Sequence, residues 1–305
     1  VLMGRVFAER PRDSFVIGTS PDLPYRYFPG RGRSLDLGTG ASTEVMLESI
    51  EGSLERLGLE HVDIYYLASI GSREAALFEP YLRAYEELKN AGKTSFIGVI
   101  THDNEPEVIR AAAESGIWDV VVTAYNFRQS HREEIREAIS DAANSGLGVI
   151  AMKTQAGVYW DSDRSRMINQ KAALKWVLLD ENVHTTIPAV ANFDELREDL
   201  SVMQDLRLTA QEQQDLGLGE RAGFAGCFCQ QCGRCLPQCP AGQHIPTLMR
   251  GHMYAFGHGR PEKARDLLGV RSASLAACIT CESCSVRCTL GLDVRAGALR
   301  LAQII

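Results

Sequence analysis

Eight of the nine cysteines lie in two runs that share one spacing. The first run is Cys229-x2-Cys232-x2-Cys235-x3-Cys239, followed by Pro240, and the second is Cys278-x2-Cys281-x2-Cys284-x3-Cys288. Three thiolates separated by two residues can hold one side of a four-iron cube on a tight loop, and the fourth thiolate then turns away to reach a second cube. The spacing therefore predicts two 4Fe-4S clusters that exchange one ligand.

Each predicted ligand set combines three cysteines of one run with the last cysteine of the other. One set is Cys229, Cys232, Cys235 and Cys288, and the other is Cys278, Cys281, Cys284 and Cys239. Two alternatives stay open, a pair of zinc sites and a disulfide scaffold, although zinc ribbons typically use separated Cys-x2-Cys pairs. Thr289 stands where a proline usually follows the last cysteine of a run, which changes the local turn and removes no ligand.

The ninth cysteine, Cys227, lies outside both runs. We interpret it as a buried spectator, and a free thiol, an alternative ligand and a redox-active group are the other interpretations.

Composition limits the class of protein and of partner. The chain has 305 residues, of which 45% are hydrophobic and 23% charged, as in ordinary globular proteins. A net charge of -7 without long single-sign runs argues against nucleic acid or an anionic membrane surface as the main partner. No apolar run approaches the roughly 20 residues that a membrane span needs. We therefore expect a small-molecule substrate or a redox partner protein, and the composition does not constrain the oligomeric state.

Cysteine placement also divides the chain, because the first 226 residues contain none. Residues 217–226 are rich in glycine and lack apolar periodicity, as is typical of a linker. The sequence thus predicts a first domain over 1–216 and a cysteine-rich second domain over 227–305.

The first domain alternates short apolar runs with segments whose apolar residues recur at helical spacing. Predicted helices include Thr43–Leu57, which Ser42 or Thr43 would cap, and Glu105–Ser115, which ends at Gly116. The predicted strands are Ser14–Ser20, Val62–Leu67, Ser95–Ile100, Asp119–Tyr125, Gly148–Lys153 and His184–Pro188.

These elements favour a parallel sheet. The run from Asp119 to Tyr125 is apolar on both faces, which is typical of a strand buried between helices. Parallel strands joined by helices form an open doubly wound sheet or a closed (β/α)8 barrel. No glycine-rich phosphate turn follows the first strand, so the barrel is favoured. Six units cannot close it, and we expect about two more upstream.

Several strand ends resemble those of the aldo/keto reductase family. The segments that carry the resemblance are Asp63–Leu67, Phe96–Val99, Ala124–Phe127, Ile150–Gly157, Ala173–Leu178, Thr186–Pro188 and Glu195–Leu200. The chain is most similar to the branch with an appended two-cluster ferredoxin-like tail. That resemblance implies a (β/α)8 TIM-type barrel, here lacking its first units, followed by a small α-helical dicluster domain. It leaves two locations open, the cytoplasm and, if a twin-arginine signal precedes Val1, the periplasm.

Two catalytic positions depart from the family pattern. The resemblance implies a tyrosine proton donor whose pKa is tuned by a lysine and a histidine. Ser20 stands at the lysine position and Ala68 at the histidine position, while the positions of the tyrosine and its aspartate would precede this sequence. Loss of such acid-base groups typically costs about 100-fold to 10,000-fold in rate, so we do not expect efficient carbonyl reduction.

The resemblance also implies NAD(P)H as a cofactor. The residues that it assigns to the nicotinamide cofactor are Tyr125, Asn126, Lys153, Glu198 and Asp199. Two positions near the cofactor depart from the family pattern, where Ile100 replaces a polar residue and Ala189 replaces a glycine.

Alternatives stay open for several of the barrel residues. Tyr125, Asn126 and Met152 could instead be packing residues that line the barrel. His102 could act as an acid-base group or be a loop histidine bonded to a nearby aspartate. The loop from Pro24 to Arg33 could bind an anion or be solvated.

The leading hypothesis is an iron-sulfur oxidoreductase or electron-transfer protein whose two 4Fe-4S clusters relay electrons. The alternative is a non-catalytic barrel subunit that docks a redox partner within a larger complex, which Ser20 and Ala68 favour. A third hypothesis keeps hydride chemistry between NAD(P)H and the clusters.

Overall fold

The computed structural model describes residues 2–21, 42–160, 165–218, 228–257, 259–268 and 272–304. The chain divides into two compact units, one formed by 1–123 with 135–150 and the other by 124–134 with 151–305.

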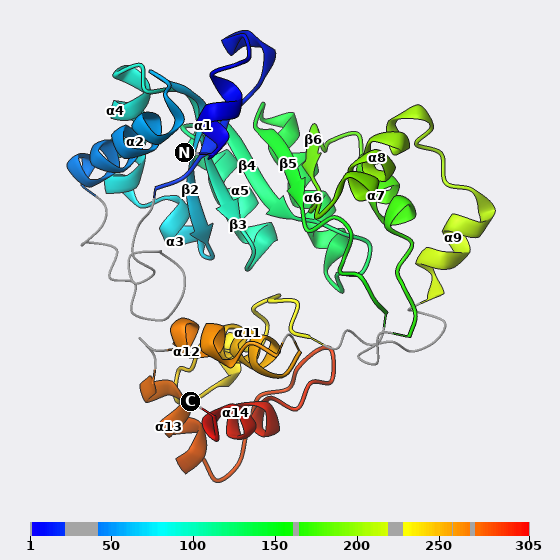
Figure 1. Ribbon diagram of the computed structural model, residues 1–305. Helices are drawn as coiled ribbons and strands as arrows, with labels where there is room; N and C mark the ends of the chain where they lie inside the picture. The colour runs from blue at the N-terminus through cyan, green and yellow to red at the C-terminus, as the bar shows by residue number, and fades with distance from the viewer. Residues whose placement is uncertain are drawn as a thin grey trace. The chain divides into compact units, whose positions relative to one another are not determined.

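Six strands form one sheet in chain order (Figure 1). They are β1 (Gly18–Thr19), β2 (Val62–Ile70), β3 (Thr94–Thr101), β4 (Val120–Ala124), β5 (Gly148–Met152) and β6 (Thr185–Ile187). The pairing is parallel from β1 to β4, with Gly18 opposite Ile64, Tyr65 opposite Ile97, and Val99 opposite Val121. This is the strand arrangement of a parallel half-barrel, and it confirms the predicted α/β fold class.

All six predicted strands are present, with differences at their ends. The first strand was expected over Ser14–Ser20, but only Gly18–Thr19 pairs with β2, because Arg12–Ser14 forms the 3-10 turn η1. The second strand extends to Ile70, beyond the predicted Leu67, with an irregularity in the pairing after Leu67.

Helices alternate with these strands in the first unit. They are α1 (Leu2–Phe7), α2 (Thr43–Leu57), α3 (Arg73–Ala76), α4 (Glu79–Asn90), α5 (Glu105–Ser115) and α6 (Arg132–Asn144). The predicted bounds of α2 and α5 are confirmed. Ser42 caps α2 by accepting a hydrogen bond from the Val45 amide, and Gly116 ends α5 in the left-handed region at φ 65°.

Aromatic packing joins helix to sheet in this unit. The ring of Tyr65 on β2 stacks on Tyr85 of α4 at 5.4 Å, and Tyr85 meets Trp118 edge-on at 5.2 Å. The Trp118 indole N–H donates to the carbonyl oxygen of Ala76 at 2.9 Å, so the polar end of the ring is satisfied in the core.

In the second unit, which also contains residues 124–134, several elements follow β5 along the chain. They are α7 (Gln170–Leu178), β6, α8 (Phe193–Ser201), the 3-10 turn η3 (Val202–Gln204) and α9 (Ala210–Leu216). Lys175 of α7 is buried and forms an ion pair with Glu212 of α9 at 3.0 Å. Thr209 and Glu212 form a capping box at the start of α9, so one glutamate serves both the cap and the ion pair.

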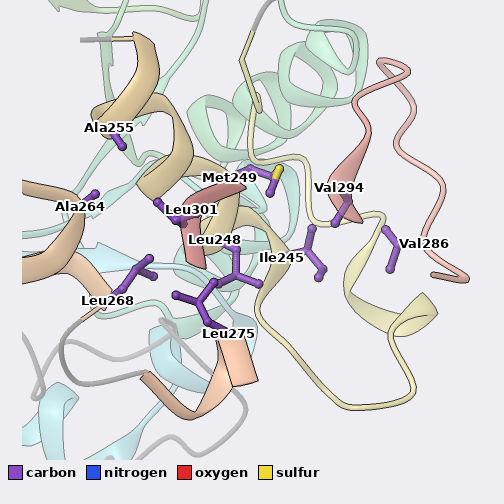
Figure 2. Packing of buried hydrophobic residues seen from close by; sticks show 10 residues of the cluster. All are labelled: Ile245, Leu248, Met249, Ala255, Ala264, Leu268, Leu275, Val286, Val294 and Leu301. Carbon is purple, nitrogen blue, oxygen red and sulfur yellow. The ribbon is translucent and has the colours of Figure 1, made fainter. Parts of the chain in front are cut away.

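The cysteine-rich part of the second unit is helical. Its elements are η4 (Leu236–Gln238), α11 (Ile245–His252), the π-helical turn η5 (Met253–Gly257), α12 (Pro261–Leu268), α13 (Ser272–Thr280) and α14 (Val294–Ala302). Figure 2 shows its core of ten buried residues, Ile245, Leu248, Met249, Ala255, Ala264, Leu268, Leu275, Val286, Val294 and Leu301. Six of the eight described cysteines pack against this core. A core of this size stabilises a domain only weakly by itself.

In the described ranges, no helix is both long and apolar enough to cross a membrane.

Candidate functional site

Tight loops carry the two cysteine runs. In the first run, Gln231 and Gly233 adopt left-handed backbone conformations at φ 59° and 74°, which bends the chain around Cys232. The turn η4 then connects Cys235 to Cys239. In the second run, Cys278 lies in the last turns of α13, and Cys281, Cys284 and Cys288 follow on a loop that ends before α14.

The fold brings cysteines of the two runs close together, and Cys235 of the first predicted set also lies near Cys239 of the second. The thiol of Cys229 interacts electrostatically with three others, those of Cys232, Cys235 and Cys288. The thiol of Cys278 interacts with those of Cys239, Cys281 and Cys284. A cavity is lined by all four members of this second set, together with Arg295 and apolar residues that include Ile245 and Val294. Cys239 of the first run therefore lies beside three cysteines of the second run.

Backbone amides are directed at several of these sulfur atoms. The Gln231 N–H donates to Cys229 Sγ at 3.3 Å, the Gln243 N–H to Cys239 Sγ at 3.4 Å, and the Leu290 N–H to Cys288 Sγ at 3.4 Å. Such hydrogen bonds favour the charged thiolate over the thiol, and they are among the factors that set the potential of an iron-sulfur cluster.

Without a cation nearby, the cysteines of the two runs favour the protonated thiol over the thiolate. Burial, together with the neighbouring thiols, raises the pKa of Cys229 to about 12 and that of Cys235 to about 11, and it also raises the pKa of Cys278. A metal that binds thiolates must therefore displace these protons. Four sulfur atoms around one cavity, with N–H donors behind them, fit the ligand shell of a 4Fe-4S cluster.

All eight described cysteines are free thiols. In the part of the chain that the structure describes, no group of three or more His, Cys, Asp or Glu side chains is close enough to hold a single metal ion. A four-iron cluster places each thiolate on a different iron atom, so its ligands need not meet at one point. Cys227, the ninth cysteine, lies outside the described residues, as does the loop from Pro24 to Arg33.

The two departing catalytic positions both lie at the C-terminal ends of strands. Ser20 directly follows β1, and Ala68 lies in the last third of β2, both half-buried. Strand ends of this kind carry the active site in parallel barrels. Neither side chain carries a positive charge that would lower the pKa of a tyrosine proton donor.

Tyr125 and Asn126 follow β4 and make contacts that a sequence cannot show. Tyr125 is fully buried, its hydroxyl hydrogen-bonds Asp180 Oδ2 at 2.9 Å, and its ring packs on Trp176 at 5.0 Å. Asn126 donates from Nδ2 to the backbone oxygen of Lys153 at 3.1 Å, which links the ends of β4 and β5. Tyr125 therefore has the contacts of a packing residue. Asn126 lies beside Lys153, at the C-terminal ends of β4 and β5.

The loop after β5 carries two residues that the sequence analysis did not single out. Lys153 itself is exposed and adopts a left-handed conformation at φ 57°. Gln155 donates from Nε2 to Asp199 Oδ1 at 3.0 Å, and so joins this loop to α8. Thr154 is buried, and its hydroxyl has no hydrogen-bond partner among the described residues. Both residues lie inside the segment Ile150–Gly157 that carries the family resemblance, and that position was the available signal.

Asp199 is the buried acidic residue of this edge. Burial, with the nearby carboxylates Glu198 and Glu195, raises the pKa of Asp199 above its ordinary value, although Gln155 acts in the opposite direction. Asp199 Oδ2 has no partner among the described residues. The loop after β5 thus connects Asn126, Lys153 and Asp199. Glu198 is exposed, and it acts on Asp199 through its charge.

The remaining candidate residues follow other strands. His102 comes directly after β3 and is half-buried, Ile100 lies within β3, and Ala189 is exposed after β6.

Comparison with known proteins assigns the two parts of the chain. The model of the aldo/keto reductase family matches residues 2–166, which is 165 of 305 residues. The model of the 4Fe-4S dicluster domain matches residues 228–293. The L-glyceraldehyde 3-phosphate reductase of Escherichia coli O157:H7 is 23% identical over 248 residues, which cover 66% of this chain and 68% of that protein.

Solved structures show the same fold. An aldo-keto reductase from Bacillus halodurans in its holo form is 20% identical, with a TM-score of 0.53, over 70% of this chain and 75% of that one. A thermostable aldo-keto reductase in complex with the inhibitor epalrestat gives a TM-score of 0.52 at the same identity and coverage. The chain therefore belongs to the aldo/keto reductase family and continues into a C-terminal 4Fe-4S dicluster domain.

Proposed function

We propose that this protein is an iron-sulfur oxidoreductase whose C-terminal domain holds two 4Fe-4S clusters and passes electrons through them. The proposed ligand sets are Cys229, Cys232, Cys235 and Cys288 for the first cluster, and Cys239, Cys278, Cys281 and Cys284 for the second.

One observation carries the proposal, the position of Cys239. This residue ends the first run, yet its side chain lines the same cavity as three cysteines of the second run. A zinc ribbon has no need for such an exchange, whereas in two-cluster ferredoxins the last cysteine of each run binds the other cluster.

The residues of the protein would bind the clusters, orient them and shield them from water. The thiolates supply negative charge, and the amides of Gln231, Gln243 and Leu290 stabilise that charge at three of the sulfur atoms. Apolar residues of the core in Figure 2, such as Ile245 and Val286, also line the cavity of the second cysteine set and limit access of water to it. When bound, an iron-sulfur cluster supplies one-electron storage at a potential that its surroundings set.

Two double variants test the ligand sets. C229S/C288S removes two ligands of the same proposed cluster, and we expect iron to fall from about eight to about four atoms per chain. C229S/C239S removes one ligand from each cluster, and we expect nearly all iron to be lost. Iron is measured on anaerobically purified protein, with the cluster signal followed by EPR after reduction.

The opposite ranking of these variants would overturn the proposed exchange of ligands, because each run would then serve its own cluster. Zinc in place of iron would overturn the proposed function. C227S is the matched control, since Cys227 belongs to neither set, and it should keep about eight iron atoms.

The role of the barrel-like part is a separate proposal. Asn126, Lys153 and Asp199 are joined by hydrogen bonds around the loop after β5, and this supports a site for NAD(P)H that Tyr125 and Glu198 flank. The alternative is a non-catalytic subunit that docks a redox partner, and the observation that favours it is the pair Ser20 and Ala68. Under either proposal, the missing lysine and histidine argue against efficient carbonyl reduction.

Anaerobic titration with NADPH separates these two roles. If the barrel-like part accepts hydride, NADPH should bleach the visible absorbance of the clusters, and D199N together with N126A should weaken that response. If NADPH leaves the spectrum unchanged while dithionite bleaches it, the clusters are functional and the docking role is supported. Iron analysis on the same sample shows whether the clusters are present, so a lack of response to NADPH is not mistaken for a lack of clusters.

A further inference from the structure

Arg295 is an arginine at the edge of the second cysteine cavity. It lies in the first turn of α14 and lines the cavity with Cys239, Cys278, Cys281 and Cys284. Its Nη2 donates to the backbone oxygen of Cys281 at 3.1 Å, which fixes the guanidinium beside the loop of the second run.

One donor of this guanidinium is unused. Arg295 Nε is buried and has no hydrogen-bond partner among the described residues. A buried N–H on a permanently charged group is costly unless a negative group accepts from it. The described carboxylates close to it in sequence are committed or solvated, since Asp293 caps α14 through the Ala296 amide and Glu282 is exposed.

The first cysteine set has different surroundings. Its described polar neighbours are neutral: the amides of Gln231 and Leu290 donate to sulfur atoms, and the hydroxyl of Thr289 lies 3.8 Å from Cys232 Sγ. Arg234, within the first run, is exposed and forms an ion pair with Glu134. Arg287 is also exposed, and its Nη1 donates to the backbone oxygens of Cys284 at 2.8 Å and Val286 at 3.1 Å, so its charge lies at the solvent side of the second set.

We propose that Arg295 gives the two clusters different reduction potentials. It holds a positive charge and an N–H donor beside the cluster of Cys239, Cys278, Cys281 and Cys284, and that cluster is therefore reduced at the higher potential. This inference rests on the proposed function, because it requires both clusters. Net charge and hydrogen bonds near the sulfur atoms are among the factors that set cluster potentials. Electrons that enter the first cluster then move toward the one beside Arg295.

The electron balance of each step is simple. A cluster gains one electron from a one-electron reductant, no bond forms or breaks, and the cluster becomes more negative by one charge. A fixed cation stabilises the reduced form more than the oxidised form, because the attraction grows with the added charge.

Redox titration monitored by EPR tests the inference on the intact, iron-loaded protein. We expect two one-electron steps, and R295Q should lower the upper step by about tenfold in its equilibrium constant, or about 59 mV for one electron, while the lower step stays in place. R295K keeps the charge and should retain most of the upper potential. R300Q is the matched control, since Arg300 lies on the same helix over the ring of Phe256 at 4.1 Å.

Iron analysis comes first and separates the two ways to fail. If the native protein does not hold about eight iron atoms, the proposed function fails. If iron is complete and R295Q leaves both steps unchanged, shifts both equally or moves only the lower step, the inference about Arg295 is wrong. Should R295Q lose iron, R295K decides: an upper step that falls as far as tenfold with charge retained would also overturn the inference.

Discussion

Asp63 shows how a single carboxylate ties two neighbouring strands together. Its Oδ2 accepts from the Ile17 amide at 2.7 Å and from Arg12 Nη2 at 2.9 Å, so it links the chain just before β1 to β2. Asp119 plays the same part between β3 and β4, because it accepts from the Ile97 amide and from Lys89 Nζ. Both aspartates lie at or just before the start of a strand. Each accepts a hydrogen bond from a backbone amide in the neighbouring strand or directly before it.

The charge of Asp63 makes this link sensitive to pH. Burial raises the pKa of Asp63, but the hydrogen bonds from Ile17 and Arg12 outweigh burial, and the net effect is a pKa below the ordinary value. A lowered folded-state pKa stabilises the protein above the unfolded pKa, near 3.9, and this stabilisation is lost as the pH falls through the folded value.

We expect D63N to lower the free energy of unfolding by about 1 kcal/mol at pH 7, because one charge-assisted hydrogen bond is weakened at a partly exposed site. The difference from the native protein should shrink as the pH falls below about 4. Urea unfolding at several pH values measures it, with D13N as the control at an exposed position. A difference that stays constant across this range would contradict the assigned role of the charge.

At the scale of elements, α7 and α9 are held together by the ion pair between Lys175 and Glu212. The two side chains are only 9% and 12% exposed, and Lys175 Nζ also donates to the backbone oxygen of Arg207 at 3.2 Å. Burial raises the pKa of Glu212, but the Thr209 amide and Lys175 more than reverse this effect, so the carboxylate stays ionised. A buried charge without its partner is much more costly than the absence of both charges.

K175M should therefore destabilise the protein by about 1–3 kcal/mol, since it removes the cation from the partly buried carboxylate of Glu212, which keeps only its bonds at the start of α9. The double variant K175M/E212Q removes the charge while it keeps the cap on α9, and should recover much of the loss. Thermal unfolding measures both variants. R83M, which breaks the exposed pair with Glu79, is the control and should cost less than about 1 kcal/mol. Additive losses in the double variant would show that the pair is not coupled.

At the scale of the whole molecule, the cysteines that we propose as cluster ligands also contribute to the packing of their domain. Six of them pack against the tail core, whose buried residues are few, so the free energy of iron binding adds to the folding free energy of that domain. The first unit has its own aromatic core around Tyr65, Tyr85 and Trp118 and contains none of the described cysteines.

Iron removal should therefore unfold one part of the protein selectively. We expect chelation under mild oxidation to raise protease cleavage within residues 228–304 by about tenfold or more, while residues 42–123 keep their protection. Mass spectrometry of the fragments locates the cuts, and the iron-loaded protein is the control. Equal loss of protection in both regions would show that the tail does not depend on its clusters for folding.

The sequence by itself determined the parallel α/β class, the six strands, the bounds of helices such as α2 and α5, and the two cysteine runs. These follow from local signals, because apolar periodicity, caps and ligand spacing are written within a few residues of one another. The first strand was predicted too long for the same reason, since the turn at Arg12–Ser14 depends in part on the distant partner Asp63.

Only the tertiary structure decided which groups meet. Tyr125 gives its hydroxyl to Asp180, 55 residues away, Gln155 reaches Asp199 across 44 residues, and Arg295 arrives beside Cys281 from the next helix. No spacing rule encodes such pairs, because they arise from the packing of whole elements, and a buried donor without a partner, such as Arg295 Nε, exists only once the chain has closed around it.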